Sequence, residues 1–325
     1  MAEALRVENL VVRFQTQLGQ VDALNGVSLV QEEGQVYCLV GESGSGKSTL
    51  ALSIMGLLPH NASIERGAIY FDGVNLLGSG PEHMRNLRGK DIAMVFQDAQ
   101  SALNPVQLVG DQLEEVILEH TNISARVANK MSQDMLRETG LADPRRIMGQ
   151  YPFQLSGGMC QRVMMAIGLV LEPRLLIADE PTSGLDVTLQ AEILDLLRKL
   201  CREQHASILL ITHDMAVVAS MAQQVGVLYA GSMIETAEVV PTFRRPQHPY
   251  TWSLIKSRPR LDEPDKRLQA LPGAPPDMMN LPGECAFLPR CQKAMSQCRI
   301  SPRPPLSELE PGHHVACYNP VVPQD

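Results

Sequence analysis

Residues 41–48 carry a phosphate-binding pattern, G-x-x-x-x-G-K-[ST], which here reads Gly41-Glu42-Ser43-Gly44-Ser45-Gly46-Lys47-Ser48. The pattern follows an apolar, strand-like run at residues 35–40 and precedes a helix-like stretch. Glycines at these positions allow backbone N–H groups to turn towards phosphate oxygens, and the start of the helix adds a favourable dipole. We expect Lys47 to neutralise the β and γ phosphates and Ser48 to bind Mg²⁺, with Thr49 in the same site. The pattern therefore predicts a site for a nucleoside triphosphate.

A second apolar run, residues 175–178, ends in two carboxylates, Asp179 and Glu180. We expect Asp179 to hold Mg²⁺ through water, while Glu180 is placed to polarise the water that attacks the γ phosphate. Taken alone, an apolar run followed by two acids is more often an ordinary exposed strand end. Together with the phosphate-binding loop, it predicts a hydrolytic site.

Residues 155–162 read Leu-Ser-Gly-Gly-Met-Cys-Gln-Arg. Ser156 is a good helix N-cap, and Gly157 and Gly158 expose backbone donors at that helix start for a second anion contact. An ordinary capped helix is the alternative interpretation. The stretch resembles the signature motif of ABC ATPases. The resemblance implies that these donors contact ATP held by the phosphate-binding loop of an opposite subunit, in a dimer with two ATP molecules in its interface.

Two residues of this motif depart from the common pattern. Met159 stands where many ABC proteins have glutamine, as is usual in the peptide-importer branch, and Cys160 stands where that branch usually has arginine. The cysteine removes a charge beside the site, so we expect it to weaken phosphate or interface contacts.

Three further elements occur in the order that the family requires. Gln97, after the apolar run 92–96, resembles the glutamine that touches Mg²⁺ and the attacking water. Asp186 ends a Ser-Gly-Leu-Asp stretch that resembles the D-loop, which crosses to the other subunit. His213 lies 33 residues after Glu180 and resembles the switch histidine, whose imidazole would contact the γ phosphate. A lone histidine after an apolar strand is usually just a strand-end residue, so position alone selects His213 from the eight in the chain.

Phe14 is the candidate for stacking on adenine. It follows Val11, Val12 and Arg13 near the start of the chain. An aromatic face contributes about 1 to 3 kcal/mol per base without hydrogen bonds. The alternative is a core-facing phenylalanine in an N-terminal strand.

The elements that position these residues predict an α/β fold with one insertion. Residues 1 to about 95 alternate strand-like runs with glycine turns, 98–158 are helical and polar, and strand-like runs return at 175–178 and 208–211 around a helical stretch at 188–201. This alternation is typical of a parallel sheet. We therefore expect an ATPase domain at 1–240, with a P-loop (RecA-like) core, an N-terminal antiparallel β subdomain as in the ABC family, and a helical subdomain at about 98–158. Residues 241–325 hold 16 of the 23 prolines, so we expect them to form a loop-rich C-terminal extension.

The second half of the chain resembles one branch of the ABC family, the ATPases of bacterial dipeptide, oligopeptide and nickel importers. Five stretches carry this resemblance: residues 96–105 after the glutamine, 186–191 after the D-loop, and 248–251, 271–276 and 285–291 in the extension. No fixed-period repeat is evident, which excludes two ATPase cassettes in this chain.

Four of the seven cysteines, Cys285, Cys291, Cys298 and Cys317, crowd into the last 41 residues with C-x₅-C-x₆-C-x₁₈-C spacing. The gaps are wider than in zinc ribbons, and the spacing leaves iron–sulfur, zinc and free thiols open. Some members of the importer branch carry a [4Fe–4S] cluster on such a tail, so the resemblance implies a cluster with a structural role. Because we assign this segment and the nucleotide site to separate domains, we expect loss of a tail cysteine to leave ATP affinity nearly unchanged. Cys38, Cys160 and Cys201 lie in apolar segments and are predicted to be buried.

Composition restricts the setting of the protein. A formal net charge of −8 and a pI near 5.5 argue against a broad surface for nucleic acid or anionic lipid. No apolar run reaches 18 residues and the first residues lack a signal-peptide pattern, so we expect a cytosolic chain that reaches the membrane through a partner.

The motifs together predict an ATPase that powers an ABC importer. The resemblance implies ATP and Mg²⁺ as ligands, and as partners a second ABC ATPase subunit, identical or paralogous, two transmembrane permease subunits and an extracytoplasmic solute-binding protein, with no nucleic acid. The chain would lie peripherally on the cytoplasmic face of the cell membrane. We expect peptides to be the transported solute. Similar ATPases also power the import of nickel, opines and oligosaccharides. The rivals are a soluble ABC ATPase of DNA repair or translation, an export ATPase, and a nucleotide-binding module without catalysis, which would lack Glu180 or His213.

Overall fold

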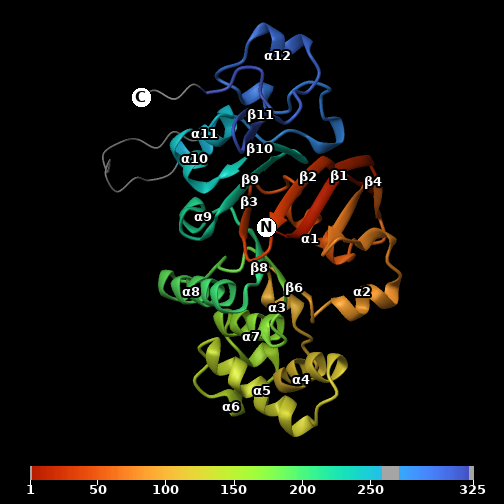
Figure 1. Cartoon of the computed structure of the whole chain (residues 1–325), viewed down its shortest axis with the longest axis vertical. Helices are drawn as coiled ribbons and strands as arrows, with labels where there is room; N and C mark the ends of the chain where they lie inside the picture. Colours follow the sequence, from red (N-terminus) through yellow and green to blue (C-terminus); the bar gives the residue numbers. More distant parts are fainter. Residues whose placement is uncertain (1, 258–270, 322–325) are drawn as a thin grey trace. The chain divides into compact units, whose positions relative to one another are not determined.

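The computed structural model describes residues 2–257 and 271–321, and the chain folds into two compact units (Figure 1). Each unit is built from segments that are distant in the sequence. Unit 1 comprises Met1–Ala4, Gln31–Val36 and Phe71–Ile211, and unit 2 comprises Leu5–Val30, Tyr37–Tyr70 and Thr212–Asp325.

Unit 1 is centred on three parallel strands, in the order β8 (Ser207–Ile211), β7 (Leu175–Asp179) and β6 (Ile92–Val95). Val95 pairs with Ala178 and Asp179 pairs with Ile211 in the strand register, so the carboxyl ends of the strands lie at the same edge of the sheet. Every residue of the three strands is buried. Continuous apolar burial is what a parallel sheet covered on both faces requires, and it confirms the predicted parallel core.

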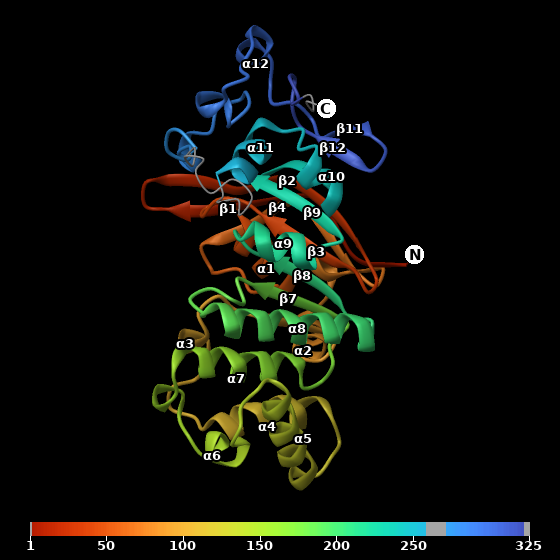
Figure 2. The ribbon, with the colours of Figure 1, turned by 90° about the vertical axis from the view of Figure 1, so that its left-hand side faces the viewer.

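Helices make up most of the rest of unit 1. In chain order its short strand and helices are β5 (Val74–Asn75), η1 (Leu76–Gly78), α2 (Pro81–Leu87), α3 (Ala99–Ala102), α4 (Val109–His120), α5 (Ala125–Glu138), α6 (Pro144–Met148), η2 (Pro152–Gln154), α7 (Gly157–Leu169) and α8 (Val187–Gln204). Ile117 of α4 and Ala128 of α5 pack with Val170 in one buried cluster. Helices α7 and α8 lie side by side (Figure 2), joined by an ion pair of 2.5 Å between Arg162 and Glu192.

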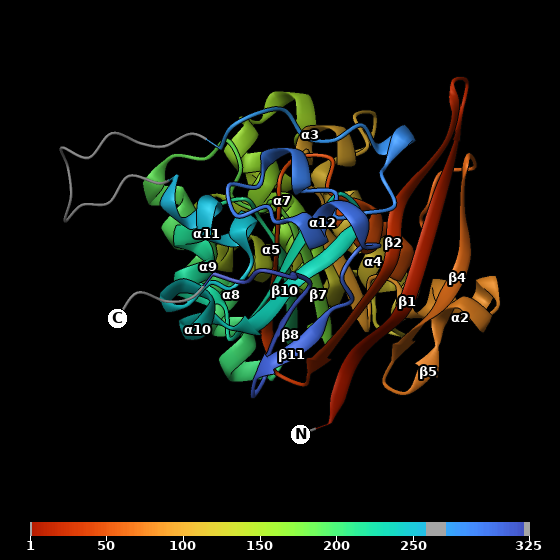
Figure 3. The ribbon, with the colours of Figure 1, turned by 90° about the horizontal axis from the view of Figure 1, so that it is seen from above.

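Unit 2 contains the long strands β1 (Glu3–Thr16), β2 (Gly19–Glu32) and β4 (Ala62–Phe71), in the order β2-β1-β4 (Figure 3). The ends of these strands, residues 3–4 of β1, 31–32 of β2 and 71 of β4, belong to unit 1. A turn of two residues joins β1 to β2, which makes them an antiparallel hairpin. The alternation of buried and exposed residues along β1 and β2 indicates one covered face.

A second sheet of unit 2 has the order β11-β12-β10-β9-β3. Strand β3 (Val36–Val40) is parallel to β9 (Gln224–Tyr229), and the other neighbours, β10 (Ser232–Glu238), β11 (Ser307–Glu310) and β12 (His313–Val315), pair antiparallel. In the described part of this unit up to residue 257, the helices are α1 (Lys47–Met55), α9 (Met215–Met221), α10 (Val239–Arg244) and α11 (Pro249–Lys256).

The described segment 271–321 has only short elements, as its proline content predicts: η3 (Met278–Asn280), η4 (Leu288–Arg290) and α12 (Ser296–Ile300), besides β11 and β12. A buried carboxylate fastens this segment to β10. Glu235 accepts hydrogen bonds from the backbone N–H groups of Gln247 and His248, and its Oε1 lies 2.7 Å from His313 Nε2. The contact with His313 joins β12 to β10, and the other two contacts join residues 247–248 to the same strand.

No helix within residues 2–257 and 271–321 is long and apolar enough to span a membrane.

Candidate functional site

The phosphate-binding loop lies between β3 and α1 in unit 2, as the sequence predicts. The Lys47 side chain is buried, and its Nζ donates to the carbonyl oxygens of Gly41 at 2.8 Å and Glu42 at 2.9 Å. Ser48, in contrast, is exposed at the first turn of α1, where its hydroxyl is open to a cation. The loop thus folds around its own lysine, which is held where a triphosphate would need a countercharge.

Glycine is required at both ends of this loop. Gly46, the N-cap of α1, has φ of 105°, and a Cβ there would lie 2.6 Å from the Ala23 carbonyl oxygen. A Cβ on Gly41 would lie 2.2 Å from the Leu228 carbonyl oxygen. Any side chain at these positions would displace backbone, so the glycines are fixed by close packing as well as by backbone conformation.

The two predicted acids lie at the carboxyl end of β7 in unit 1. Asp179 is buried as the last residue of the strand, and Glu180 is half-buried. Glu180 has φ of 50°, a left-handed conformation that is uncommon for a residue with a side chain. Its N–H donates to the Ile211 carbonyl oxygen at 2.9 Å, and its carbonyl oxygen accepts from Ser183 at 3.1 Å. Strained residues held by their neighbours in this way are concentrated at active sites, where they aim a side chain.

Two further predicted residues follow the neighbouring strands. Gln97 is exposed, two residues after the end of β6, and β6 pairs directly with β7. In unit 1 the structure therefore brings Gln97 to the same sheet edge as Asp179 and Glu180. His213 is exposed, two residues after the end of β8, and belongs to unit 2.

The signature stretch forms the start of α7 in unit 1. Ser156 is its N-cap, and its hydroxyl accepts from the Met159 N–H at 3.3 Å, as the sequence predicts. Gly157 is exposed at the first position of the helix. A Cβ on Gly158 would lie 3.2 Å from Leu189, so this glycine allows α7 to pack closely on the start of α8. The helix start presents its backbone donors outward, as an anion contact requires.

Asp186 has a structural task in addition to the predicted one. It is the N-cap of α8, and its Oδ1 accepts from the Leu189 N–H at 3.0 Å. Ser183 and Gly184, on the exposed loop before it, remain accessible.

The prediction that Cys160 is buried is confirmed, and its effect on phosphate or interface contacts stays a prediction. Cys160 is fully buried in α7, and its Sγ lies 3.5 Å from the Pro152 carbonyl oxygen. It therefore lies away from the exposed helix start, because the helical turn points it into the core. Cys38 and Cys201 are buried as predicted, and burial raises the pKa of all three thiols.

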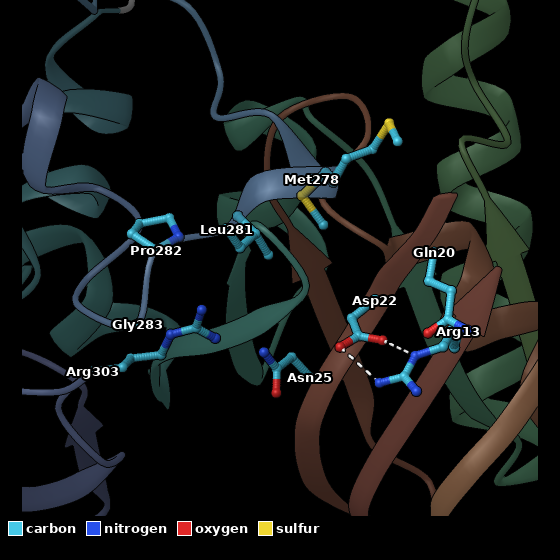
Figure 4. A pocket seen from close by; sticks show the side chains of 10 residues that line it. Arg13, Gln20, Asp22, Asn25, Met278, Leu281, Pro282, Gly283 and Arg303 are labelled. Carbon is cyan, nitrogen blue, oxygen red and sulfur yellow. Dashed lines mark hydrogen bonds and ion pairs between the residues drawn. The ribbon is translucent and has the colours of Figure 1, made fainter. Parts of the chain in front are cut away.

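Phe14 is half-buried near the end of β1, so it is not enclosed in the core. The neighbouring Arg13 lines a different feature, a pocket of about 500 Å³ between the β1–β2 hairpin and residues 278–283 (Figure 4). There Arg13 forms an ion pair with Asp22, with Nε 2.6 Å from Oδ1, opposite Leu281 and Pro282. No residue of the phosphate-binding loop lines this pocket, so it is not the triphosphate site.

Sequence reasoning missed two residues that contact the phosphate-binding loop from the C-terminal part of unit 2. Arg290 forms a two-pronged ion pair with Glu42, and the Tyr250 hydroxyl accepts a hydrogen bond from the Glu42 N–H at 2.9 Å. The C-terminal extension and the phosphate-binding loop are therefore in direct contact at Glu42. No spacing rule joins residues 248 positions apart, although Tyr250 and Arg290 both lie in stretches that resemble the importer branch.

The four tail cysteines line one small cavity of about 20 Å³, which their sequence spacing could not show. Burial raises the pKa of Cys285 and Cys291, and raises that of Cys317 to about 12. Among the described residues, however, no three or more histidine, cysteine, aspartate or glutamate side chains have the arrangement that holds a metal ion. The structure brings the sulfurs to one cavity without forming a coordination site.

Comparison with known proteins gives a family match for the ATPase part of the chain and another for its C-terminal part. Residues 24–183 match the family model described as ABC transporter, and residues 234–298 match the model described as oligopeptide/dipeptide transporter, C-terminal region. The chain is 46% identical over 304 residues to the dipeptide transport ATP-binding protein DppD of Bacillus subtilis, covering 93% of this chain and 91% of that protein. It is 44% identical over 317 residues to the oligopeptide transport ATP-binding protein OppD of Escherichia coli, covering 98% and 93%.

Solved structures are similar over the ATPase part. The fold matches the dimeric structure of the ABC transporter cassette MJ0796 with a TM-score of 0.67 and 27% identity, covering 72% of this chain and 98% of that one. A second MJ0796 structure, described as a dimeric post-hydrolysis state bound to ADP and Pi, gives the same TM-score with 26% identity.

Proposed function

Because the chain belongs to the family of ABC transporter ATPases that carry the oligopeptide/dipeptide transporter C-terminal region, we propose that it hydrolyses ATP to power peptide import. The chain is an ABC ATPase with a mixed α/β P-loop fold. Peptide cargo is favoured over nickel, opines or oligosaccharides because the relatives named above are described as dipeptide and oligopeptide transport proteins. The same matches favour an importer over a soluble ABC ATPase of DNA repair or translation.

The observation that carries this proposal is the loop around Lys47, since it combines a buried cation with an exposed Ser48 at a helix start. We assign residues 41–49 to the phosphates and Mg²⁺ of ATP, and Phe14 to the adenine. Asp179 and Gln97 would complete the Mg²⁺ site. Glu180 would act as the base for the attacking water, and His213 would orient that water.

A second ABC ATPase subunit is the first partner. Ser156, Gly157 and Gly158 present backbone donors at an exposed helix start, and the loop before Asp186 is exposed as well. Both features suit contact with ATP on an opposite subunit, and MJ0796, to which the fold is similar, is described as dimeric. Two ATP molecules would then lie between the subunits.

Permease subunits are the second kind of partner, and unit 1 offers a surface for them. Tyr151 and Phe153 are exposed and stacked, with ring centroids 5.5 Å apart. Val106 is also exposed, and the Val109 N–H donates to the Gln150 carbonyl oxygen at 2.9 Å, which joins the two segments. Large apolar side chains gathered on one exposed surface indicate a binding site for another protein. Two permeases would hold the chain at the cytoplasmic face of the membrane, and an extracytoplasmic solute-binding protein would deliver the peptide.

We further propose that the four tail cysteines hold a structural [4Fe–4S] cluster, or alternatively zinc. What supports this is the chemistry of the donors, four sulfurs lining one cavity, whereas their present arrangement does not match a metal-ion site. Protein purified without oxygen would then be brown and contain about four irons and four sulfides per chain. One zinc and no colour would favour the zinc alternative. Four thiols that alkylate freely in the native protein would refute both.

The experiment that tests the ATPase assignment is Glu180→Gln in the assembled complex. The variant should bind ATP normally and hydrolyse it at least about 100-fold more slowly, because a positioned base contributes about 10² to 10⁴ in rate. It should accumulate as an ATP-bound dimer, alone or with its partner ATPase. Near-normal turnover would remove Glu180 from the role of base.

A further inference from the structure

The C-terminal extension touches the phosphate-binding loop at Glu42, and an aromatic cluster holds it there. Tyr229, at the end of β9, packs against Tyr250 and Phe287 with ring centroids 4.7 Å and 5.3 Å apart, and Tyr250 and Phe287 lie 5.5 Å apart. All three side chains are buried. Edge-to-face and tilted aromatic contacts of this kind restrict ring positions. The segment from Phe287 to Arg290 is therefore fixed beside the loop.

All three nitrogens of the Arg290 guanidinium group donate hydrogen bonds, and these fix the orientation of the side chain. Nη1 and Nη2 donate to the two carboxylate oxygens of Glu42 at 2.8 Å and 2.9 Å. Nε donates to the Pro272 carbonyl oxygen at 2.9 Å, and Nη1 also donates to the Tyr229 hydroxyl at 3.2 Å. The side chain is only 5% exposed, against 26% for Glu42. A guanidinium group does not lose its proton in proteins, so the charge is permanent.

Glu42 is the second residue of the loop that surrounds the triphosphate, and all its polar groups are engaged. Its carboxylate binds Arg290, its N–H donates to Tyr250, and its carbonyl oxygen accepts from Lys47. A carboxylate at this point would repel a polyanionic ligand, because opposed like charges disfavour binding. The buried Arg290 cation neutralises that carboxylate and fixes it through two hydrogen bonds.

We propose that Arg290 is a positioning residue for ATP binding, which acts through Glu42 to neutralise and fix the phosphate-binding loop. The C-terminal extension is then a working part of the nucleotide site. This inference rests on the proposed assignment of residues 41–49 to ATP. The proposed role of Arg290 and Tyr250 in holding the loop does not depend on any metal in the cavity that the four tail cysteines line.

Binding of MgATP to the full-length chain, measured by titration calorimetry, tests the proposal. Arg290→Ala should raise the dissociation constant about tenfold, in line with the loss of hydrogen bonds between charged groups. The dissociation constant of Arg290→Lys should lie between those of the wild type and Arg290→Ala, because lysine keeps the charge without the two-pronged geometry. Arg299→Ala removes an exposed arginine from the same extension and should bind ATP like the wild type.

The decisive variant is Glu42→Gln combined with Arg290→Ala. If Arg290 acts by neutralising Glu42, removing the carboxylate should restore most of the affinity lost in Arg290→Ala. A role confined to folding of the extension would give no such rescue. Wild-type affinity in Arg290→Ala, or failure of Glu42→Gln to rescue it, would overturn the proposal. If the wild type itself bound ATP no better than Lys47→Ala, the assignment of the ATP site would fail instead. If Arg290→Ala did not fold, the affinities of Arg290→Lys with and without Glu42→Gln would provide the same comparison.

Discussion

Gln161 of the signature helix donates its side-chain amide to the carbonyl oxygen of Pro181, at 2.9 Å, in a buried contact. Pro181 directly follows Glu180, so the hydrogen bond joins the helix that begins with the signature to the segment that carries the proposed base. Because α7 starts at Gly157, a movement of its first turn would be transmitted to Glu180 through this one amide. The two motifs are thereby coupled within unit 1.

Replacing Gln161 by leucine should therefore slow hydrolysis more than it weakens binding. The Pro181 carbonyl would be buried without a partner, which costs about 1–3 kcal/mol of stability. A small displacement of Glu180 should lower kcat by about tenfold or more, since misplacement by about 1 Å can cost 100-fold. Steady-state kinetics would show this as a fall in kcat with KM nearly constant. Gln133→Leu, which removes a half-exposed amide on α5, is the matched control; an equal loss in both variants would contradict the coupling.

Lys47→Ala should lose ATP affinity instead of turnover. Lys47 Nζ is held by two loop carbonyls in a buried position, and we assign it as the direct countercharge for the β and γ phosphates. Loss of hydrogen bonds to charged groups should weaken binding about ten- to hundredfold. Equilibrium binding of ATP measures this, with Lys199→Ala, an exposed lysine on α8, as control. Undiminished binding would contradict the assignment of the loop.

Phe14→Ala should weaken ATP binding by about 1 to 3 kcal/mol while bound-state turnover stays nearly constant, because stacking acts on the base and not on the phosphates. Phe14→Tyr keeps the aromatic face and should bind as the wild type does. The half-buried position of Phe14 is compatible with this role. A loss of folding without a specific effect on nucleotide binding would favour a packing role.

Local signals in the sequence predict the parallel strands, the capped signature helix and the phosphate-binding loop, because each depends on residues close together in the chain. The extension is different. Its bond to Glu42 through Arg290 spans 248 positions, and its His313 meets the buried Glu235 of β10 across 78 positions. Neither pair has a periodicity or spacing that marks it, since burial and partner choice arise only when the chain folds.

The buried His248 makes the stability of unit 2 sensitive to pH. His248 is the N-cap of α11, and its Nδ1 accepts a hydrogen bond from the Tyr250 N–H at 3.0 Å, which requires a neutral ring. Burial lowers the pKa of His248 to about 4, although the nearby Glu235 carboxylate opposes this. In the unfolded chain the pKa of histidine is about 6.5. The unfolded state therefore binds the additional proton between these values, and the stabilisation present above pH 6.5 is lost as the pH falls towards 4.

His248→Asn should remove most of this dependence. Asparagine is also a good N-cap, so it can accept from the Tyr250 N–H without titrating. Urea unfolding at several pH values between 7.5 and 4.5 should show the wild type losing stability more steeply than the variant, by up to about 1.4 kcal/mol for each pH unit below 6.5. Comparing the two proteins cancels the titration of groups that they share, including Glu235 and His313. Parallel curves across this range would mean that His248 is protonated with equal ease in the folded and unfolded chains, and that its burial does not control the acid stability of the extension.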